Sequence, residues 1–389
     1  MGRIIISEVW DKLFLFLMDD QDHPQFIKAL PAGQINTVGN IYVGKVSQVV
    51  PGISGAFISI SSSEKVFLPF SECDEPDLHQ GDELLVQIKT PAIKTKLPGA
   101  SAKLCLTGRY CVCHLNGHGI AYSKKLSFEQ TKELKQALAQ ADIPGKKNYQ
   151  FTIRTNAGML TDMEPLFQEM KQFIQILEDL QQNGCHRTIY SCLYRTKPEM
   201  VKAVNDIPLN QYDGIVTDFP AVYEELSEFL PPESLRLYQD PLLPLAKLYS
   251  LETHLKQALA KTVWLPSGGY LVIEPTEAMT VIDVNSGKGS NLKNAVKHNL
   301  YLKTNLEAAK EIARQLRLRN LSGMIMVDFI NMEQEEDNQK LLSRFDEWLS
   351  ADPVKTRLVD MTALGIVEIT RKKESSPLSD VFKKDQKER

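Results

Sequence analysis

The chain has 389 residues, of which 43% are hydrophobic and 24% are charged, and its formal net charge is −4 at pH 7. A chain of this length exceeds one hydrophobic core, so we expect two to four domains, and its composition excludes a disordered protein. The slightly acidic balance excludes a protein that coats polyanions through overall charge, so any contact with nucleic acid must come from local patches.

Neither a membrane segment nor a disulfide framework is expected. No stretch approaches the roughly 18 apolar residues of a spanning helix, and Glu8 and Asp11 interrupt the apolar run that a signal peptide needs. We therefore expect a cytoplasmic protein. None of the six cysteines forms a CxxC pair. Half a zinc site at Cys111-Val112-Cys113-His114 is the alternative to a strand there, and the strand is favoured.

The first third of the chain reads as β structure. Residues 3–19 predict two strands, RIIISEV and KLFLFLM, with a turn at Trp10-Asp11. Residues 37–106 then carry the short strands NIYVGKVSQVV, GAFISI, KVFLPF and ELLVQIK, separated by turn signals. Short strands at this spacing predict a small closed barrel.

Residues 107–262 mix strands with helices. Helical patterns cover 127–141 and 162–182, and from residue 187 strands and helices alternate through TIYSCLY, GIVTDF and LRLYQ. Such alternation is typical of an α/β domain. We expect the N-terminal strands to pair with this later segment, so that the barrel and the unit after it are inserted between them.

The last part predicts a strand–helix–strand unit. GYLVIE and MTVIDVN are two strands, a helical stretch covers roughly 292–319, and MIMVDFI is the next strand. Thr304-Asn305-Leu306-Glu307 matches the capping-box pattern, so a helix could restart there. We expect the arginines of this helix (Arg314, Arg317 and Arg319) to form a solvated face.

Two carboxylates and an amide are expected to converge in this unit. Asp283 and Asn285 are two residues apart on a strand, so their side chains share a face. A crossover helix makes the next strand parallel, which brings Asp328 beside them at one edge of the sheet. Such oxygen ligands suit Mg²⁺. For each residue alone, a helix cap or a turn former is the alternative.

The motifs of this chain are also familiar. TVIDVNSG, then NLEAAKEIARQLRLRNLSGMIMVDFINM, then GIVEITRKK closely resemble the catalytic domain of the ribonuclease E/G family. The barrel sequence resembles the RNA-binding OB-fold of that family, and IRTNAG resembles its 5′-sensor motif. The resemblance runs from Arg3 to about Arg371.

The resemblance implies a multidomain α/β and β fold. Residues 1–36 with 187–262 would form an interrupted ribonuclease-H-like structural domain, and 37–106 an inserted OB-fold. Residues 107–186 would form a 5′-sensor domain, and 263–375 a deoxyribonuclease-I-like catalytic domain, before a polar tail at 376–389. The implied activity is endonucleolytic hydrolysis of single-stranded RNA to 5′-phosphate and 3′-hydroxyl ends, in rRNA maturation and mRNA turnover.

The resemblance also assigns residues. Asp283 and Asp328 would bind the catalytic Mg²⁺, for which Mn²⁺ could substitute, and Asn285 and Arg371 would complete the catalytic set. Arg154 and Thr155, with the main chain of Gly108 and Val112, would bind a 5′-monophosphate, so monophosphorylated RNA would be preferred. Phe57, Phe67 and Lys96 would contact RNA.

Each of these roles has a structural alternative. Arg154 could form a surface ion pair, the two phenylalanines could belong to the core, and Arg371 could be a solvated charge. The family usually carries a CPxC zinc link and a small dimerising domain after this point, which the printed sequence does not contain. Zinc and a zinc-linked dimer are therefore not expected, and another homo-oligomer is left open. The rival functions are a catalytically weak RNA-binding protein and a phosphodiesterase of other specificity, such as a DNA nuclease.

Overall fold

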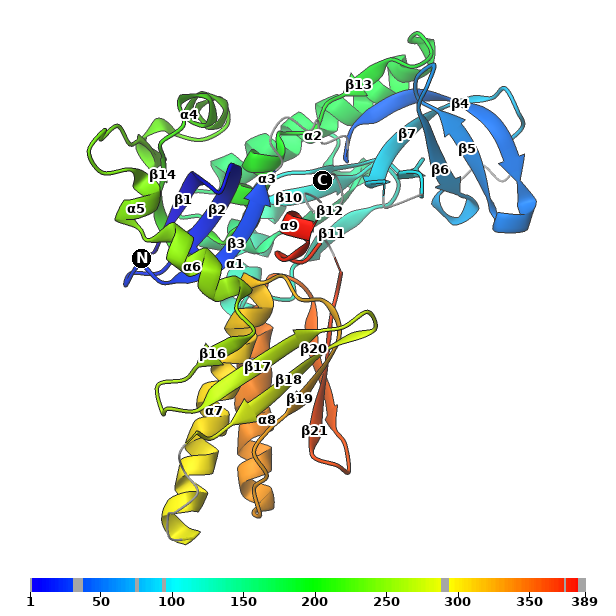
Figure 1. Cartoon of the computed structure of the whole chain (residues 1–389). Helices are drawn as coiled ribbons and strands as arrows, with labels where there is room; N and C mark the ends of the chain where they lie inside the picture. The colour runs from blue at the N-terminus through cyan, green and yellow to red at the C-terminus, as the bar shows by residue number, and fades with distance from the viewer. Residues whose placement is uncertain are drawn as a thin grey trace. The chain divides into compact units, whose positions relative to one another are not determined.

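The structure is a computed structural model, and it describes residues 2–30, 38–73, 77–92, 96–287, 294–373 and 376–383 (Figure 1). The chain divides into two compact units. The first unit comprises Met1–Ala32 and Asn210–Arg389, and the second comprises Gly33–Leu209. Among the described residues no helix is long and apolar enough to cross a membrane.

The first unit contains a five-stranded sheet in the order β15-β14-β1-β2-β3. Its strands are β1 Gly2–Val9, β2 Lys12–Met18, β3 Pro24–Leu30, β14 Tyr212–Thr217 and β15 Leu235–Leu237. The predicted hairpin turn is present, and both Trp10 and Asp11 have positive φ angles, as a two-residue hairpin loop requires. β1 also pairs in parallel with β14, so both segments of the unit contribute strands to one sheet.

Short helices accompany this sheet. They are α4 Pro220–Ser227, α5 Leu245–Leu248, α6 Leu251–Leu259 and α9 Asp380–Lys383. Two short helices, rather than one long helix, precede Lys261, because Ser250 between α5 and α6 adopts a left-handed conformation. Leu251 and Leu255 of α6 pack with Phe14 and Phe16 of β2 in one core.

The same unit holds a six-stranded sheet, called here the C-terminal sheet, in the order β16-β17-β18-β19-β21-β20. Its strands are β16 Thr262–Trp264, β17 Tyr270–Pro275, β18 Met279–Asn285, β19 Gly323–Asp328, β20 Thr356–Met361 and β21 Ile366–Arg371. Two long helices, α7 Asn294–Leu318 and α8 Glu335–Ser350, lie side by side along one face of it (Figure 1). Alternate residues such as Ile282 and Val327 pack against Ile312 and Phe345 of the helices, which leaves the opposite face exposed.

Helix α7 runs unbroken through the segment Thr304–Glu307. The predicted capping box is therefore wrong: Thr304 and Asn305 are fully buried inside the helix and bind neighbouring loops instead. The Asn305 side-chain amide donates to the carbonyl of Ile330 at 2.8 Å and accepts from its N–H at 3.1 Å. Glu307 accepts from the N–H of Ser267 at 2.9 Å. This residue pattern often caps a helix. In this protein the same residues lie inside α7 and bind two loops to it.

The predicted solvated face of arginines on α7 is also wrong. Arg319 is only 7% exposed, and burial lowers the pKa of its guanidinium to about 10. Burial lowers the pKa of Arg317 as well. Arg314 donates to Glu311 and to the carbonyl of Pro24. The end of α7 packs against the five-stranded sheet and the C-terminal segment, so these side chains have protein neighbours on what the helix pattern alone presents as an outer face.

The second unit contains the predicted barrel. Its five strands are β4 Ile41–Val50, β5 Gly55–Ser59, β6 Lys65–Pro69, β7 Glu83–Thr90 and β8 Gly99–Ser101. The barrel closes because β4 pairs with both β5 and β7, while β8 pairs with β6 and β7. This closed five-stranded arrangement is the one that an OB-fold has. The segment TIYSCLY contributes only β13 Cys192–Tyr194, which pairs with β4 rather than with the five-stranded sheet.

A four-stranded sheet in the order β11-β12-β10-β9 completes the second unit. Its elements are β9 Cys105–Thr107, β10 Cys111–His114, β11 Gly119–Tyr122 and β12 Gln150–Ile153, with α1 Phe128–Gln140, α2 Glu164–Asn183 and α3 Glu199–Asp206. Phe151 of the sheet packs with Met170 and Leu177 of α2. Cys111 and Cys113 are buried on β10, and burial raises the pKa of the Cys113 thiol to about 12, so this thiol stays protonated at neutral pH.

Candidate functional site

Asp283 and Asp328 lie directly opposite each other on neighbouring strands. β18 and β19 are parallel, and the last register pair between them joins these two residues. Their side chains share one face because Ile282, Val284 and Val327 alternate with them and enter the core. Both aspartates are exposed. Each lies within a strand, and helix α8 begins only at Glu335, so neither residue caps a helix or forms a turn.

Asn285 completes this trio on the same face. Its side-chain N–H donates to Oδ2 of Asp283 at 2.6 Å, which fixes the orientation of that carboxylate. The amide oxygen is an acceptor, so the trio offers two carboxylates and one neutral oxygen. In the described part of the chain, no group of three or more His, Cys, Asp or Glu side chains could hold a metal ion. Two exposed carboxylates still fit Mg²⁺, which usually takes one or two of them and keeps several waters.

Buried polar contacts position the chain on both sides of the trio. Asn305 holds the backbone of Ile330, two residues after Asp328, through its two hydrogen bonds. At the end of β18, a side chain on Gly269 would come within 2.6 Å of the carbonyl oxygen of Asn285, so the turn before β17 packs closely there. These positioning residues were missed from sequence, where Asn305 looked like part of a helix cap.

Arg371 is not brought together with the trio. It is 3% exposed and pairs with Asp352 at 2.8 Å in a buried ion pair, and it also donates to Asn320 and to the carbonyl of Leu321. On β21 it lies opposite Gly323, at the other end of β19 from Asp328. Arg371 therefore lies neither beside the expected metal ligands nor in solvent. Arg371 stabilises the C-terminal sheet from inside.

Arg154 lies beside Gly108, and the side chains of both Arg154 and Thr155 already have partners. Arg154 donates to the carbonyl of Gly108 and pairs with Asp206 at 2.7 Å. The hydroxyls of Thr155 and Ser123 are 3.0 Å apart. Arg154 thus makes an ion pair, as its structural alternative holds, and it makes that pair within the predicted pocket.

A side-chain carboxylate accepts hydrogen bonds from the backbone amides next to this pocket. Glu169 of α2 accepts from the N–H groups of Arg109, Tyr110 and Cys111, each at 2.8 Å. A side chain on Gly108 would overlap the Glu169 carboxylate, so only glycine allows this close approach. Val112 follows on β10, opposite Thr152 of β12. The loop is therefore built to hold an anionic group with its main chain.

Phe57 and Phe67 form a pair on the outer face of the barrel. They are cross-strand partners on β5 and β6, their ring centroids are 5.7 Å apart, and both side chains are only partly buried. Their neighbours Ala56, Ile58 and Leu68 fill the barrel interior instead. A side chain on Gly55 would overlap the ring of Phe67, which lies against that glycine. The two rings are thus half-buried on the outer face, where part of each ring is available for contact.

Lys96 lies on the segment that leads into β8. Its side chain is exposed, and two residues later the carbonyl of Pro98 accepts from the N–H of Phe67 at 2.8 Å. The structure therefore places the exposed Lys96 on the chain next to the aromatic pair.

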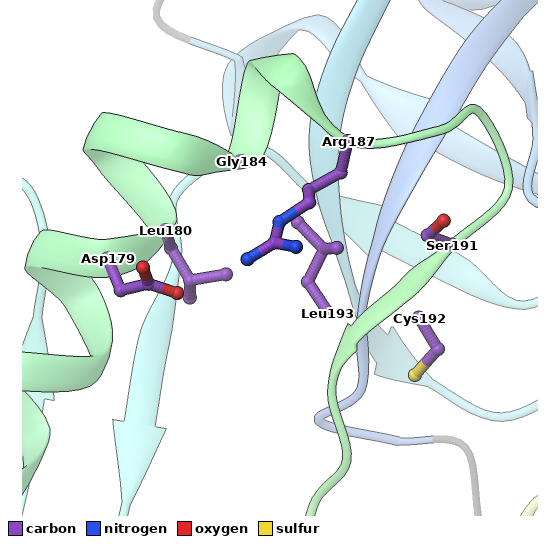
Figure 2. A pocket seen from close by; sticks show the side chains of 7 residues that line it. All are labelled: Asp179, Leu180, Gly184, Arg187, Ser191, Cys192 and Leu193. Carbon is purple, nitrogen blue, oxygen red and sulfur yellow. The ribbon is translucent and has the colours of Figure 1, made fainter.

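The second unit also contains a cavity of about 330 Å³ between the end of α2 and β13 (Figure 2). Asp179 and Leu180 line it from α2, and Ser191, Cys192 and Leu193 line it from the β13 segment. The guanidinium group of Arg187 points into the space between these segments (Figure 2). None of the site residues expected from the sequence lines this cavity.

Comparison with known proteins identifies the family. Residues 105–374 match the Ribonuclease E/G family. The chain is 31% identical over 365 residues to Ribonuclease E of Synechocystis sp., covering 89% of this chain and 53% of that protein. It is 32% identical over 400 residues to Ribonuclease E of Nostoc sp., covering 98% and 57%.

Ribonuclease G of Escherichia coli (strain K12) is 32% identical over 371 residues, which cover 89% of this chain and 74% of that protein. The chain belongs to the Ribonuclease E/G family. It spans about half the length of the two Ribonuclease E proteins.

Proposed function

We propose that this protein is a metal-dependent endoribonuclease that hydrolyses single-stranded RNA. The observation that carries the proposal is the in-register pair Asp283 and Asp328 on an exposed sheet face, in a chain of the Ribonuclease E/G family. The products would be a 5′-phosphate and a 3′-hydroxyl, and the biological role would lie in rRNA maturation and mRNA turnover.

The metal would be Mg²⁺, with Mn²⁺ as a substitute. Asp283 and Asp328 would hold it, and the hydrogen bond from Asn285 would keep the first carboxylate in position. When bound, the ion would make a water easier to deprotonate and offset negative charge at the phosphate. The chain would contribute the rigid placement: both carboxylates stand on paired strands, and Asn305 fixes the backbone that follows Asp328.

The barrel would bind the RNA, as an OB-fold that presents aromatic side chains. Phe57 and Phe67 offer two partly exposed rings at 5.7 Å, and a base that stacks on such rings contributes about 1–3 kcal/mol without sequence preference. Lys96 would add a positive charge for the neighbouring phosphate. Because overall charge cannot provide affinity in a chain of net charge −4, these local contacts have to.

The 5′ end of the RNA would be read in the second unit. Arg154 and Thr155 would contact a 5′-monophosphate, with the main chain of Gly108 and Val112 beside them. The supporting observation is the neighbouring run of backbone amides that already holds the Glu169 carboxylate. A phosphate would have to take the Arg154 guanidinium from Asp206, and this competition limits how strongly the pocket can favour a monophosphate.

The domain identities follow from the same family relation. Residues 1–36 with 187–262 would be a ribonuclease-H-like domain with a structural role, interrupted by the barrel at 37–106 and the 5′-sensor domain at 107–186. Residues 263–375 would be the deoxyribonuclease-I-like catalytic domain. Support comes from the parallel pairing of β1 with β14, which joins distant segments in one sheet, and from the trio on the C-terminal sheet.

The deciding experiment is cleavage of a 5′-labelled single-stranded RNA with Mg²⁺, with Mn²⁺ and with excess EDTA, followed by mapping of the product ends. We expect cleavage with either ion, none in EDTA, and new 5′-phosphate ends. An RNA-binding protein without catalysis would retain the RNA and leave it intact. Equal cleavage of single-stranded DNA would favour a nuclease of other specificity, and cleavage in EDTA would overturn the metal mechanism.

A further inference from the structure

An aromatic pair, one ring exposed and the other half-buried, stands at the edge of the C-terminal sheet. Trp264 of β16 and Tyr270 of β17 are cross-strand partners, and their ring centroids lie 5.2 Å apart with an interplanar angle of 53°. Trp264 is 71% exposed, although a tryptophan in a folded protein is normally mostly buried. Its neighbour Val263 packs against the core instead, so the strand turns the indole outward.

This aromatic pair shares a face with the acidic trio. Tyr270 lies directly opposite Asn285. The side chain of Asn285 donates a hydrogen bond to Asp283, which lies opposite Asp328. Cross-strand partners project to the same side of a sheet, so all five side chains stand on one face. With strands about 4.8 Å apart, Trp264 is roughly 10 Å from Asn285 across the sheet.

The turn between the two aromatic residues is closely packed. The N–H of Leu265 donates to the carbonyl of Gly269 at 2.8 Å, and the N–H of Ser267 donates to Glu307 of α7 at 2.9 Å. A side chain on Gly269 would meet both Asn285 and Thr304 within 3 Å. The turn therefore fixes the backbone that carries the two rings relative to the trio, which suits a binding platform.

Apolar side chains continue this face on the other side of the acids. Val281 is 40% exposed and Met324 is 51% exposed, on the two central strands that carry Asp283 and Asp328. A metal site for water and phosphate alone does not require such neighbours. They suit a nucleotide next to the bound phosphate, because its base presents an apolar π-face to neighbouring side chains.

We propose that Trp264 and Tyr270 form a stacking platform for a nucleobase that neighbours the scissile phosphate. This inference rests on the proposed function and extends it: the platform would set where along a single strand the phosphate enters the acidic trio. Base stacking on an aromatic ring accepts any base, so the platform would position the strand without reading its sequence. A contact with another protein is the competing use of this face, and the tests below separate the two.

Tryptophan fluorescence tests the contact without using catalysis. A short oligoadenylate is titrated into Asp283→Asn protein, which cannot cut it under the proposed mechanism, and into the same protein with Trp264→Phe. We expect the oligonucleotide to quench emission, and most of the quenching to disappear with Trp264→Phe. Trp10→Phe is the matched control, because Trp10 is a 37% exposed tryptophan of the same unit, in the hairpin turn between β1 and β2 of the five-stranded sheet. Quenching that survives Trp264→Phe would overturn the proposal.

Cleavage then tests the position of the base. In wild-type protein with Mg²⁺, an RNA with one abasic site near the cut should be cleaved about five- to thirtyfold more slowly at one offset from the scissile phosphate. Trp264→Ala and Tyr270→Ala should slow the intact RNA by a similar factor and remove the sensitivity to the abasic site. Trp264→Phe should keep most of the rate. Phe128→Ala, which alters a phenylalanine that is 80% exposed in the second unit, should change nothing.

The outcomes distinguish this proposal from the one on which it rests. If wild-type protein never cleaves RNA yet Trp264 is quenched by the oligonucleotide, the proposed endoribonuclease fails and the base contact stands. If RNA is cleaved but Trp264→Ala cuts intact and abasic substrates as wild type does, the platform alone is overturned. A change in hydrodynamic mass in Trp264→Ala, with unchanged RNA cleavage, would assign this face to contact with another protein and overturn the platform as well.

Discussion

The acidic trio and the predicted 5′-phosphate pocket contrast in what their polar groups already bind. Asp283 and Asp328 face solvent side by side, and the side chain of Asn285 donates a hydrogen bond to Asp283. The Arg154 guanidinium is shared between Gly108 and Asp206, and the nearby backbone amides hold Glu169. The trio leaves two negative charges that a cation can offset. At the pocket, an anion has to displace an internal carboxylate before it can bind the guanidinium or the amides.

This contrast predicts large effects at the trio and graded effects at the pocket. Two like charges held close on paired strands favour the binding of a cation. A surface ion pair such as Arg154–Asp206, with side-chain exposures of 25% and 60%, contributes only about 0–1 kcal/mol, so a phosphate can displace it.

The largest effect is expected at the trio. Asp283→Asn and Asp328→Asn should each lower cleavage of single-stranded RNA at least about a hundredfold, because each removes charge that the ion and the transition state need. RNA affinity should change by no more than a few-fold, since the barrel is unaltered. Cleavage rates at saturating Mg²⁺ and RNA binding by filter retention measure the two quantities. Robust cleavage by either variant would contradict the metal site.

The next effect concerns stability rather than activity. Arg371→Ala should lower the free energy of unfolding by about 3–5 kcal/mol, because it leaves Asp352 as an uncompensated buried charge. Denaturant unfolding measures it. Arg357→Ala, on the exposed face of the neighbouring strand β20, is the control and should stay within about 0.5 kcal/mol. A variant that stays stable and loses only cleavage would return Arg371 to the catalytic set.

The pocket predicts a preference for the 5′ end of the substrate. RNA with a 5′-monophosphate should be cleaved about ten- to hundredfold faster at limiting substrate than RNA with a 5′-hydroxyl, because a charge-assisted contact contributes about 1.5–3 kcal/mol. A triphosphate should also be disfavoured. Arg154→Ala should erase the preference and spare 5′-hydroxyl RNA. Equal rates on all three ends would show that the pocket is no sensor, and equal loss on all would make Arg154 structural.

The barrel offers a comparison with both regions, since its two rings are half-buried, whereas Asp283 and Asp328 are exposed. Phe57→Ala and Phe67→Ala should each weaken RNA binding by about 1–3 kcal/mol and slow cleavage at limiting RNA, without altering the Mg²⁺ dependence. Circular dichroism provides the check on folding. If both variants unfold, the rings serve packing and not RNA.

The smallest effect sharpens the contrast itself. Asp206→Asn removes the acid that competes for Arg154, so the monophosphate preference should rise by up to about fivefold, the factor that 1 kcal/mol represents. Parallel cleavage of monophosphorylated and hydroxylated RNA measures the ratio. Glu199→Gln, at the start of the same helix α3, is the charge-matched control. A fall in the ratio would mean that Asp206 helps to orient Arg154 instead of competing with a phosphate.

The trio was predictable because it depends on local rules. Alternation along MTVIDVN and MIMVDFI separates the buried residues from Asp283, Asn285 and Asp328, and a helical crossover makes the two strands parallel. The same alternation also predicts the direction of the Arg371 side chain. Arg371 follows the buried residues Val367 and Ile369 at steps of two, so its side chain points into the core as theirs do.

The partners of the charged side chains were decided by the tertiary structure. The closed barrel and the hairpin at Trp10 follow from turn residues and strand spacing, which act over a few positions of the chain. Asp206 pairs with Arg154, Glu169 accepts from the amides after Gly108, and Asp352 pairs with Arg371. The partners in these contacts are 19 to 60 positions apart in the chain. Likewise, Thr304 to Glu307 has the pattern of a helix cap, but in the structure these residues bind the loops that pack on α7. A sequence pattern states which face a side chain takes, whereas packing between distant segments decides what that face meets.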